Sequence, residues 1–302
     1  DLIKEFSPKI VISHIPHSIE FSIIAKFLQN EIKFIAIQHG HHDLLSLSRS
    51  LKKKIFIPEF FCFGNYEKNI YEKSEIEIKE FFPIGSLRAS LSLEYLSKNN
   101  QNKDIEYDIC LISEYSPSKK KLFPSKSDDL QLIPSYPDHV GKIAYFCHKL
   151  RDEEKLRLVF CGDSAPDSIY QKIENDFYKK YLSHTNFEII QKKRDTYPTY
   201  INLLKSKIVI GGYSTVMREA LSLGKKVLSC NFTNNESINF PLNNICLFTK
   251  NNYEEFKKIV LKIIEMSEED YFKQLNSDKK FIIEDSHQTS NMMRKKISNY
   301  LS

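Results

Sequence analysis

The sequence predicts an α/β protein with two lobes, each built on a parallel sheet. Short apolar runs alternate along the chain with longer amphipathic stretches, which is the order of β-α-β units. Most of these runs are continuously apolar, as expected of strands that helices cover on both faces. With 302 residues, 41% of them hydrophobic, the chain is long enough to form two cores of ordinary size.

Nine apolar runs are the predicted strands. They occupy residues 9–13, 33–37, 60–64, 107–113, 156–162, 187–190, 206–212, 225–230 and 244–248. The helical patterns between them occupy residues 18–29, 66–79, 140–154, 168–182, 198–205 and 214–223. The polar stretch 96–107 has no apolar periodicity and is the predicted linker. We therefore expect a first lobe at residues 1–98, a second lobe at 105–250 and C-terminal helices at 251–302.

The charge balance excludes a dedicated nucleic-acid binder. The chain carries 44 Lys and Arg against 39 Asp and Glu, a net charge of +5, which suits an anionic ligand or a membrane surface better. The six cysteines are widely spaced, without a C-x-x-C pair, and are expected to be buried in a reducing compartment. No stretch approaches the roughly 20 apolar residues of a membrane span, and no signal peptide is visible. We therefore expect a cytoplasmic protein.

The segment 206–230 is the strongest candidate for a ligand site. A predicted strand ends in two glycines, and Tyr213, Ser214 and Thr215 stand where a helix begins. Backbone N–H groups and the helix dipole at such a terminus favour an anion, and a phosphate fits there. Glu219 lies one turn further in and is placed to meet the hydroxyls of a ribose. An ordinary N-cap with a solvated glutamate explains the same spacing.

This segment, with its pattern S-T-x-x-x-E-A-x-x-x-G-K-K-V-L, resembles the donor-nucleotide segment of GT-B glycosyltransferases. The blocks IAIQHG (35–40), FFCFGNYEKNIYEK (60–73), FFPIGSLRAS (81–90) and YDICLISE (107–114) are similar, in the same order, to bacterial surface-carbohydrate biosynthesis proteins. The group around retaining β-Kdo transferases and CDP-glycerol or polysialic-type capsule transferases is the most similar. The resemblance implies a GT-B fold of two Rossmann-like lobes, although the first lobe is short for a complete acceptor domain.

In such a fold, the loops after the carboxyl ends of strands line the ligand crevice. Gln38, His39 and Gly40 follow one predicted strand, and His14, His17 and Glu20 follow another. A histidine there can take a proton from an acceptor hydroxyl. Glu20 is the preferred carboxylate, either as the general base of an inverting transfer or as the nucleophile of a retaining one. A satisfied structural histidine is the alternative for each imidazole.

Further donor-binding candidates follow from position. Gly85, Ser86 and Arg88 follow an apolar run near the lobe boundary, where the arginine fork suits a phosphate or carboxylate. Ser113 and Glu114 follow the first strand of the second lobe. A surface arginine and ordinary polar loops are the alternatives.

We expect neither a metal nor a resident cofactor. The run of His39, His41, His42 and Asp43 lacks the helical spacing of zinc proteases, and no strand-terminal D-x-D occurs. The leaving phosphate is then stabilised by the helix dipole and side chains. Lysine-rich stretches at 48–56 and 116–127 suit an anionic lipid-linked acceptor or peripheral contact with the inner membrane, although solvated loops explain them as well.

Taken with the resemblance, these features predict a glycosyltransferase. It is expected to move a sugar, Kdo or a nonulosonate, from a CMP-linked donor to a bacterial surface glycan or lipid-linked primer. The alternatives are a CDP-glycerol-type phosphotransferase, a nucleotide-sugar 2-epimerase and a non-catalytic module of the same fold. The expected partners are the nucleotide-sugar donor and the acceptor, with no nucleic acid.

Overall fold

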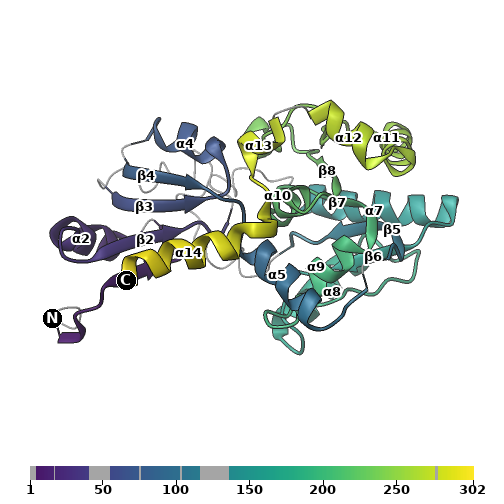
Figure 1. Ribbon diagram of the computed structural model, residues 1–302. Helices are drawn as coiled ribbons and strands as arrows, with labels where there is room; N and C mark the ends of the chain where they lie inside the picture. Colours follow the sequence, from purple (N-terminus) through teal and green to yellow (C-terminus); the bar gives the residue numbers. More distant parts are fainter. Residues whose placement is uncertain are drawn as a thin grey trace. The chain divides into compact units, whose positions relative to one another are not determined.

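The computed structural model describes residues 5–16, 18–40, 55–74, 76–102, 104–115, 136–275 and 278–302. The chain forms two compact units (Figure 1). The first unit comprises Asp1–Leu91 and Ser277–Ser302, and the second comprises Ser92–Asn276. Each unit is described by itself below.

The first unit contains a four-stranded parallel sheet. Its strands, in spatial order, are β1 (Ile10–Ser13), β2 (Lys33–Ile37), β3 (Phe56–Cys62) and β4 (Glu77–Pro83). Helix α2 (Ile19–Leu28) connects β1 to β2, and helix α4 (Asn65–Tyr71) connects β3 to β4. The described part of this unit ends in α13 (Asp278–Ile282), the short 3-10 helix η2 (Ser286–Gln288) and α14 (Thr289–Leu301).

Helices cover both faces of this first sheet, as its continuous apolar strands predict. Successive side chains of a strand point to opposite faces. Phe34 and Ala36 pack in a cluster with residues of α2 and α4. Ile35 and Phe61 pack in a separate cluster with Met293 of α14. Figure 1 shows α14, in yellow, running alongside this sheet. The last helix of the chain therefore completes the core of the first unit.

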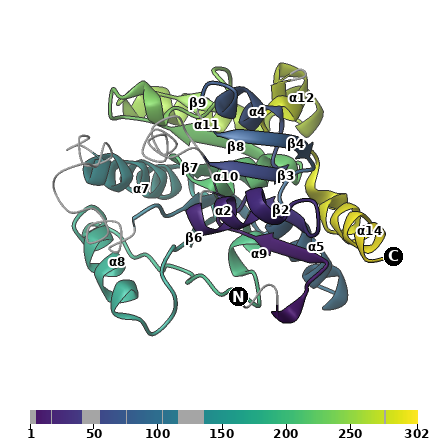
Figure 2. The same ribbon diagram turned by 90° about the vertical axis from the view of Figure 1, so that its left-hand side faces the viewer.

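The second unit contains a five-stranded parallel sheet with the order β6-β5-β7-β8-β9. Its strands are β5 (Tyr107–Ile112), β6 (Leu158–Cys161), β7 (Ser206–Gly211), β8 (Lys226–Cys230) and β9 (Leu247–Phe248). Its helices are α5 (Leu87–Lys98), which begins in the first unit, α7 (Tyr136–Glu154), α8 (Ile169–Lys179), α9 (Pro198–Leu204), α10 (Thr215–Ser222), η1 (Glu236–Ile238), α11 (Tyr253–Glu265) and α12 (Glu268–Leu275). Figures 1 and 2 show α8 on the β6 side of the sheet and α11 on the β8 side.

The strand order of the second sheet contains a topological switch point. The chain passes from β5 to β6 in one direction across the sheet, and from β7 to β8 in the other. Strands β5 and β7 are neighbours, with Ile109 paired to Ile208. In open α/β sheets, ligands bind at the carboxyl ends of strands at such a point. The loops after β5 and β7 are therefore where a ligand of this unit is expected.

The structure confirms most of the predicted strands and helices, and it corrects two. The helix predicted at 66–79 is wrong, because α4 ends at Tyr71 and β4 follows at Glu77–Pro83. Strand β4 lies at the edge of the described sheet with its charged residues exposed, so it lacks a continuous apolar run. The strand predicted at 187–190 is a single bridge between Ile190 and Cys161. Helix α5 was not among the predicted helices.

The C-terminal region is helical, as predicted, but it is divided between the two units. Helices α11 and α12 belong to the second unit, whereas α13 and α14 belong to the first. The apolar face of α14 packs on the first sheet, which explains the division. All six cysteines are buried and form no disulfide, in agreement with the sequence analysis. None of the helices in the described part of the chain has the length and apolar character of a membrane span.

Candidate functional site

A hydrogen bond joins the two loops at the switch point of the second unit. Glu114 follows β5, and Gly212 follows β7. The Gly212 N–H donates to Glu114 Oε1 at 3.1 Å, and the Glu114 side chain is 5% exposed. A hydrogen bond from an amide to a buried carboxylate is stronger than one between neutral groups. The pair therefore fixes the backbone that leads into helix α10.

Gly212 makes this arrangement possible because it has no Cβ. A Cβ atom at this position would lie 2.6 Å from Glu114 Oε2 and 2.9 Å from His139 Nε2. His139 comes from α7, is buried, and accepts a hydrogen bond at Nδ1 from the Phe232 N–H at 3.2 Å. Burial lowers the pKa of His139 to about 4. The imidazole is therefore neutral at pH 7, with its proton on Nε2.

The predicted anion site lies at the start of α10. Ser214 is the N-cap, and its Oγ accepts a hydrogen bond from the Val216 N–H at 3.3 Å. Tyr213, Ser214 and Thr215 are half-buried. The cap is the local structure that the sequence indicated. Backbone N–H groups at such a terminus are suited to a phosphate, so the anion-binding role of these residues stays a prediction with a fitting geometry.

Glu219 lies within α10 and is 2% exposed. The hydroxyl of Tyr200, on α9, donates a hydrogen bond of 2.6 Å to Glu219 Oε2. The solvated glutamate that was the alternative reading of the spacing is therefore wrong. Sequence reasoning missed the tyrosine, because Tyr200 and Glu219 are separated by strand β7 in the chain and their spacing follows no local pattern.

The Ser113 side chain belongs to a buried network rather than to an open surface. Its hydroxyl donates to Glu174 Oε1 at 2.5 Å and shares a hydrogen bond of 2.9 Å with the Tyr178 hydroxyl. Glu174, which is fully buried on α8, also accepts hydrogen bonds from the N–H groups of Asp163 at 3.0 Å and Ser164 at 3.2 Å. The carboxylate therefore ties the loop after β6 to the loop after β5. Sequence reasoning missed Glu174, which reads as one polar residue of an amphipathic helix.

In the first unit, two of the predicted histidines meet at the carboxyl end of the sheet. The rings of His14, after β1, and His39, after β2, lie 5.8 Å apart in an edge-to-face arrangement. Partial burial of His39 lowers its pKa, and the neighbouring His14 imidazole lowers that pKa further. Both side chains keep contact with solvent. A neutral, accessible imidazole such as that of His39 can accept a proton.

Gln38 supports the loop that carries His39. Its Nε2 donates to the Gly40 carbonyl and to Glu67 Oε1, each at 2.9 Å, and its Oε1 accepts from the Phe63 N–H at 2.7 Å. The side chain is 3% exposed. The side-chain amide of Gln38 forms hydrogen bonds with three protein groups, so Gln38 supports the loop. A contact of Gln38 or Gly40 with the sugar donor stays a prediction. Glu67 was missed, because its N3 position in α4 reads only as a capping glutamate.

Glu20, the preferred catalytic carboxylate, lies in the first turn of α2 and is exposed. The hydroxyl of Ser18, the N-cap of this helix, donates to Glu20 Oε2 at 2.9 Å. A carboxylate in this turn is also favoured by the helix dipole. His17 lies outside the described residues, and its predicted role stays a prediction.

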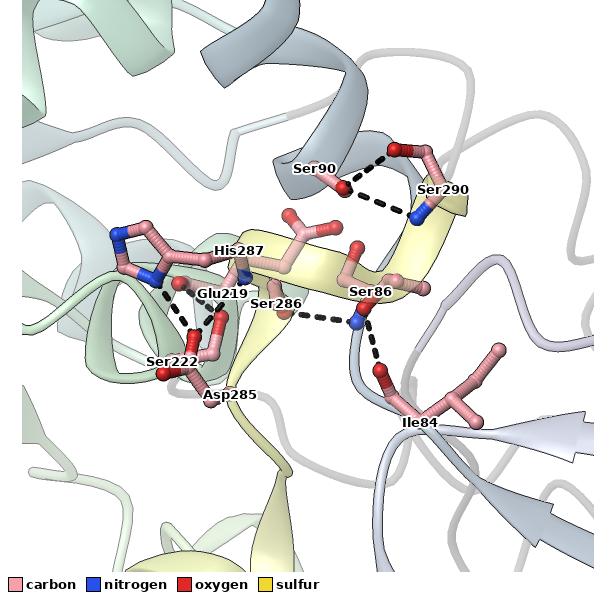
Figure 3. A network of polar contacts seen from close by, with 10 residues as sticks. Ile84, Ser86, Ser90, Glu219, Ser222, Asp285, Ser286, His287 and Ser290 are labelled. Atoms are coloured by element: carbon pink, nitrogen blue, oxygen red, sulfur yellow. Dashed lines mark hydrogen bonds and ion pairs between the residues drawn. The ribbon is translucent and has the colours of Figure 1, made fainter. Parts of the chain in front are cut away.

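Gly85 and Ser86 are buried, and Figure 3 shows Ser86 beside the C-terminal segment of the first unit. Gly85 has φ +84°, and a Cβ there would lie 2.8 Å from Ser286 Oγ. The Ser86 N–H donates to the same Oγ at 2.9 Å, and the Thr289 hydroxyl donates to the carbonyl before Gly85. These two residues therefore join the sheet to α14. Arg88, in the first turn of α5, is half-buried, and its donor contact stays a prediction.

Within the described residues, no group of three or more His, Cys, Asp or Glu side chains is arranged to hold a metal. His41, His42 and Asp43 lie outside the described residues, as do the lysines of 48–56 and 116–127.

A cavity of about 480 Å³ opens in the second unit away from the switch point. Tyr107 and Leu158, the first residues of β5 and β6, line it together with His148 and Arg151 of α7. None of the residues that line it belongs to the loops after β5 and β7, so it is a different region from those loops.

A family model described as "putative O-antigen biosynthesis protein" matches residues 35–297. The match covers most of the chain and includes both sets of loops. The chain belongs to this O-antigen biosynthesis family. No curated protein sequence matches it.

Solved structures share the fold. The UDP-GlcNAc 2-epimerase from Neisseria meningitidis, bound to UDP-GlcNAc, is 17% identical, with a TM-score of 0.55 over 100% of this chain and 78% of that one. The wall teichoic acid polymerase TagF, in a structure with CDPG, is 12% identical, with a TM-score of 0.54 over 97% of this chain and 74% of that one. At these identities the likeness shows the fold alone. The α/β architecture of GT-B type, with two Rossmann-like units and a helical C-terminus, is confirmed.

Proposed function

We propose that the protein is a glycosyltransferase that moves a sugar from a nucleotide-linked donor to a surface glycan or its lipid-linked primer. Membership of an O-antigen biosynthesis family supports a role in the synthesis of a surface glycan. The observation that carries the proposal is the bond between Gly212 and Glu114 at the switch point. It shapes the loop directly before the capped N-terminus of α10, where a nucleotide phosphate fits.

In this proposal the second unit holds the nucleotide. The hydroxyls of Ser214 and Thr215 and the N-terminal amides of α10 bind the phosphate, and Glu219 binds the ribose. As the bond between the anomeric carbon and the phosphate oxygen breaks, the oxygen keeps the electron pair. The helix dipole stabilises the negative charge that the oxygen acquires. This chemistry needs no metal, so transfer is expected to survive treatment with EDTA.

The first unit supplies the acid-base chemistry. In an inverting transfer, Glu20 or His39 accepts the proton of the acceptor hydroxyl while that oxygen bonds to the anomeric carbon. In a retaining transfer, a carboxylate first forms a covalent bond to the sugar. The lowered pKa of His39 keeps its imidazole neutral and therefore able to accept a proton.

A CMP-linked donor carrying Kdo or a nonulosonate is the first choice, from the family resemblance. Two fold relatives support alternatives. A structure of TagF with CDPG favours a CDP-linked substrate and a phosphotransferase reaction. The epimerase bound to UDP-GlcNAc favours a UDP-sugar and 2-epimerisation. A non-catalytic binding module would give no turnover with any donor.

A nucleotide panel tests the proposal. Thermal stabilisation of the protein is measured with CMP, CDP and UDP, and turnover is measured with the matching sugar donors. We expect stabilisation by CMP and release of CMP from the donor in the presence of an acceptor glycan. Stabilisation by CDP or UDP would instead support the phosphotransferase or the epimerase. Stabilisation by none of the three would contradict a nucleotide-dependent function.

A pair of N-cap variants locates the site. Ser214→Ala removes the cap of α10, and Ser168→Ala removes the cap of α8, where Oγ accepts from the Gln171 N–H at 3.1 Å. Each is expected to cost about 1 kcal/mol of stability. Only Ser214→Ala should also weaken nucleotide binding, by roughly tenfold. Equal nucleotide affinities of the two variants would show that the phosphate does not bind at the start of α10.

A further inference from the structure

A buried phenol and a buried carboxylate meet between the two helices that flank strand β7 in the sequence. Tyr200 lies on α9, directly before the strand, and Glu219 lies on α10, directly after it. Each side chain is 2% exposed, and the hydroxyl donates to Glu219 Oε2 at 2.6 Å. The pair therefore links the helix that enters β7 to the helix that carries the predicted phosphate site.

Stability alone is a weak reason for this pair. Glu219 lies among buried residues of α10, which include the apolar Met217 and Ala220 and the charged Arg218. Removing a carboxylate from water costs about as much as its polar contacts return. The chain satisfies another buried phenol without any carboxylate, since the Tyr271 hydroxyl donates to the Val227 carbonyl at 2.6 Å. The Tyr200 bond therefore contributes more by directing the carboxylate than by stabilising the fold.

The surroundings of Tyr200 hold its ring in one place. Its ring packs edge-to-face on Tyr197 at 6.1 Å, and Tyr197 packs on Tyr95 at 5.7 Å. Tyr197 is the N-cap of α9, with φ 49°, and Pro198 follows it. A proline fixes its own φ and restricts the residue before it. The hydroxyl is thus presented from a rigid aromatic support.

A fixed hydroxyl limits the orientations of the carboxylate that it binds. A glutamate side chain has three rotatable bonds, and a bond to Oε2 selects the rotamers that keep this atom in place. A carboxylate has about four lone-pair sites and can accept several hydrogen bonds at once. Two neighbouring hydroxyls of a ribose are donors that such an oriented carboxylate can accept from together.

We infer that Tyr200 is a positioning residue that orients Glu219 toward a ribose diol and thereby makes the nucleotide site selective for ribonucleotides. This inference rests on the proposed function, in which Glu219 binds the ribose. A group oriented before the ligand arrives binds it with a smaller entropic cost. Without the hydroxyl of Tyr200, the carboxylate samples other rotamers and the advantage of the diol is lost.

The test compares ribonucleotides with their dideoxy counterparts. Dissociation constants of CMP, CDP and UDP, and of the 2′,3′-dideoxy form of each, are measured for the wild type, Tyr200→Phe, Glu219→Gln and Tyr271→Phe. Tyr271→Phe is the matched control, because it also removes one buried hydroxyl from the second unit. For the nucleotide that binds, we expect Tyr200→Phe and Glu219→Gln to lose affinity for the ribo form by about fivefold to tenfold. Affinity for the dideoxy form should be unchanged, and the control should keep the wild-type ratio.

The outcomes separate this inference from the proposed function. If Glu219→Gln loses the preference for the ribo form while Tyr200→Phe keeps it, the role of Tyr200 is overturned and the nucleotide site stands. If Tyr200→Phe weakens the ribo and dideoxy forms equally, its role is structural and the inference is also overturned. If the wild type binds nucleotides without any preference, the contact between Glu219 and ribose is wrong, and the inference falls with it. If no nucleotide binds, both the proposed function and this inference are overturned.

Discussion

The two units place polar residues at the carboxyl ends of their sheets in different ways. In the second unit, Glu114 and Glu174 are buried and bonded to backbone N–H groups of neighbouring loops. In the first unit, the buried groups are Gln38 and Glu67, and the imidazole they support, His39, remains accessible to solvent. The buried, bonded carboxylates of the second unit are suited to holding a ligand in a preformed site. The accessible imidazole of the first unit is suited to accepting or donating a proton.

The largest expected effect comes from removing the predicted proton acceptors of the first unit. Glu20→Gln or His39→Gln, whichever removes the group that accepts the proton, should lower the rate of sugar transfer by about 10² to 10⁴, the usual contribution of general acid-base catalysis. Nucleotide binding should be unchanged, because it belongs to the second unit. Both are measured as kcat and as the dissociation constant of the nucleotide.

His287→Gln is the matched control for these variants. His287 is an exposed histidine of the same unit that pairs with Asp285 and has no role in the proposed chemistry. Its transfer rate should equal that of the wild type. Full activity of Glu20→Gln would show that Glu20 is not the catalytic carboxylate. Full activity of both Glu20→Gln and His39→Gln would show that neither residue accepts the proton in the transfer.

A slightly smaller effect is expected at the preformed loop of the second unit. Gly212→Ala places a Cβ at 2.6 Å from Glu114 Oε2, so the loop must move. Nucleotide affinity, measured by titration calorimetry, should fall by about 100-fold, which corresponds to one lost hydrogen bond to a charged group. Gly224→Ala is the control, since Gly224 has φ +82° but an added Cβ meets nothing within 4 Å. If both variants bind nucleotide equally well, the loop after β7 is not part of the site.

Acid should affect the second unit more than the first. Burial lowers the pKa of both His139 and His148 to about 4, whereas the unfolded chain protonates them near pH 6.5. Between these pH values the unfolded state binds more protons than the folded state. The contribution of each neutral histidine to the free energy of unfolding is therefore complete above pH 6.5 and is lost as the pH falls toward 4. Each histidine accounts for on the order of 3 kcal/mol.

Hydrogen exchange at pH 7 and pH 4.5 measures this effect in each unit separately, after correction for the intrinsic pH dependence of exchange. Peptides from β5 to β8 should lose more protection than peptides from β1 to β4. His148→Phe, which removes one titrating group, should reduce the difference. An equal loss of protection in the two units would contradict the prediction that acid destabilises the second unit more than the first.

The smallest effect is expected where the C-terminal segment meets the first sheet. Ser286→Ala leaves the buried N–H of Ser86 without its acceptor, which should lower the free energy of unfolding by about 1 to 2 kcal/mol. Ser298→Ala, on the exposed side of α14, should have little effect. Urea denaturation measures both. An equal response would show that the junction in Figure 3 adds no stability.

The predicted fold was accurate where strands are covered on both faces. Runs such as 33–37 and 206–212 are continuously apolar because helices cover them, and they are strands β2 and β7. Strand β4 was missed because an edge strand leaves charged residues such as Glu77 and Lys79 exposed to solvent. A segment of this kind satisfies helical and strand patterns equally well, and only its pairing with β3 decides between them.

The candidate site could be predicted only in part. The cap at Ser214 depends on neighbours within two residues, so the sequence carries its signal. Gln38 and Ser86 read as loop residues before a ligand, but their partners turned out to be protein groups. Glu174 and Tyr200 carried no sequence signal, because each acts through a partner on another element.

The sequence by itself determined the alternation of strands and helices, the two-unit α/β class and the capped helix that follows β7, because these depend on neighbouring residues and on apolar periodicity. Only the tertiary structure decided which polar groups meet. The bond between Gly212 and Glu114 spans 98 residues, and that between Ser86 and Ser286 spans 200. Such contacts depend on strand order and on the return of α14 to the first sheet, and no local pattern in the chain records either of these.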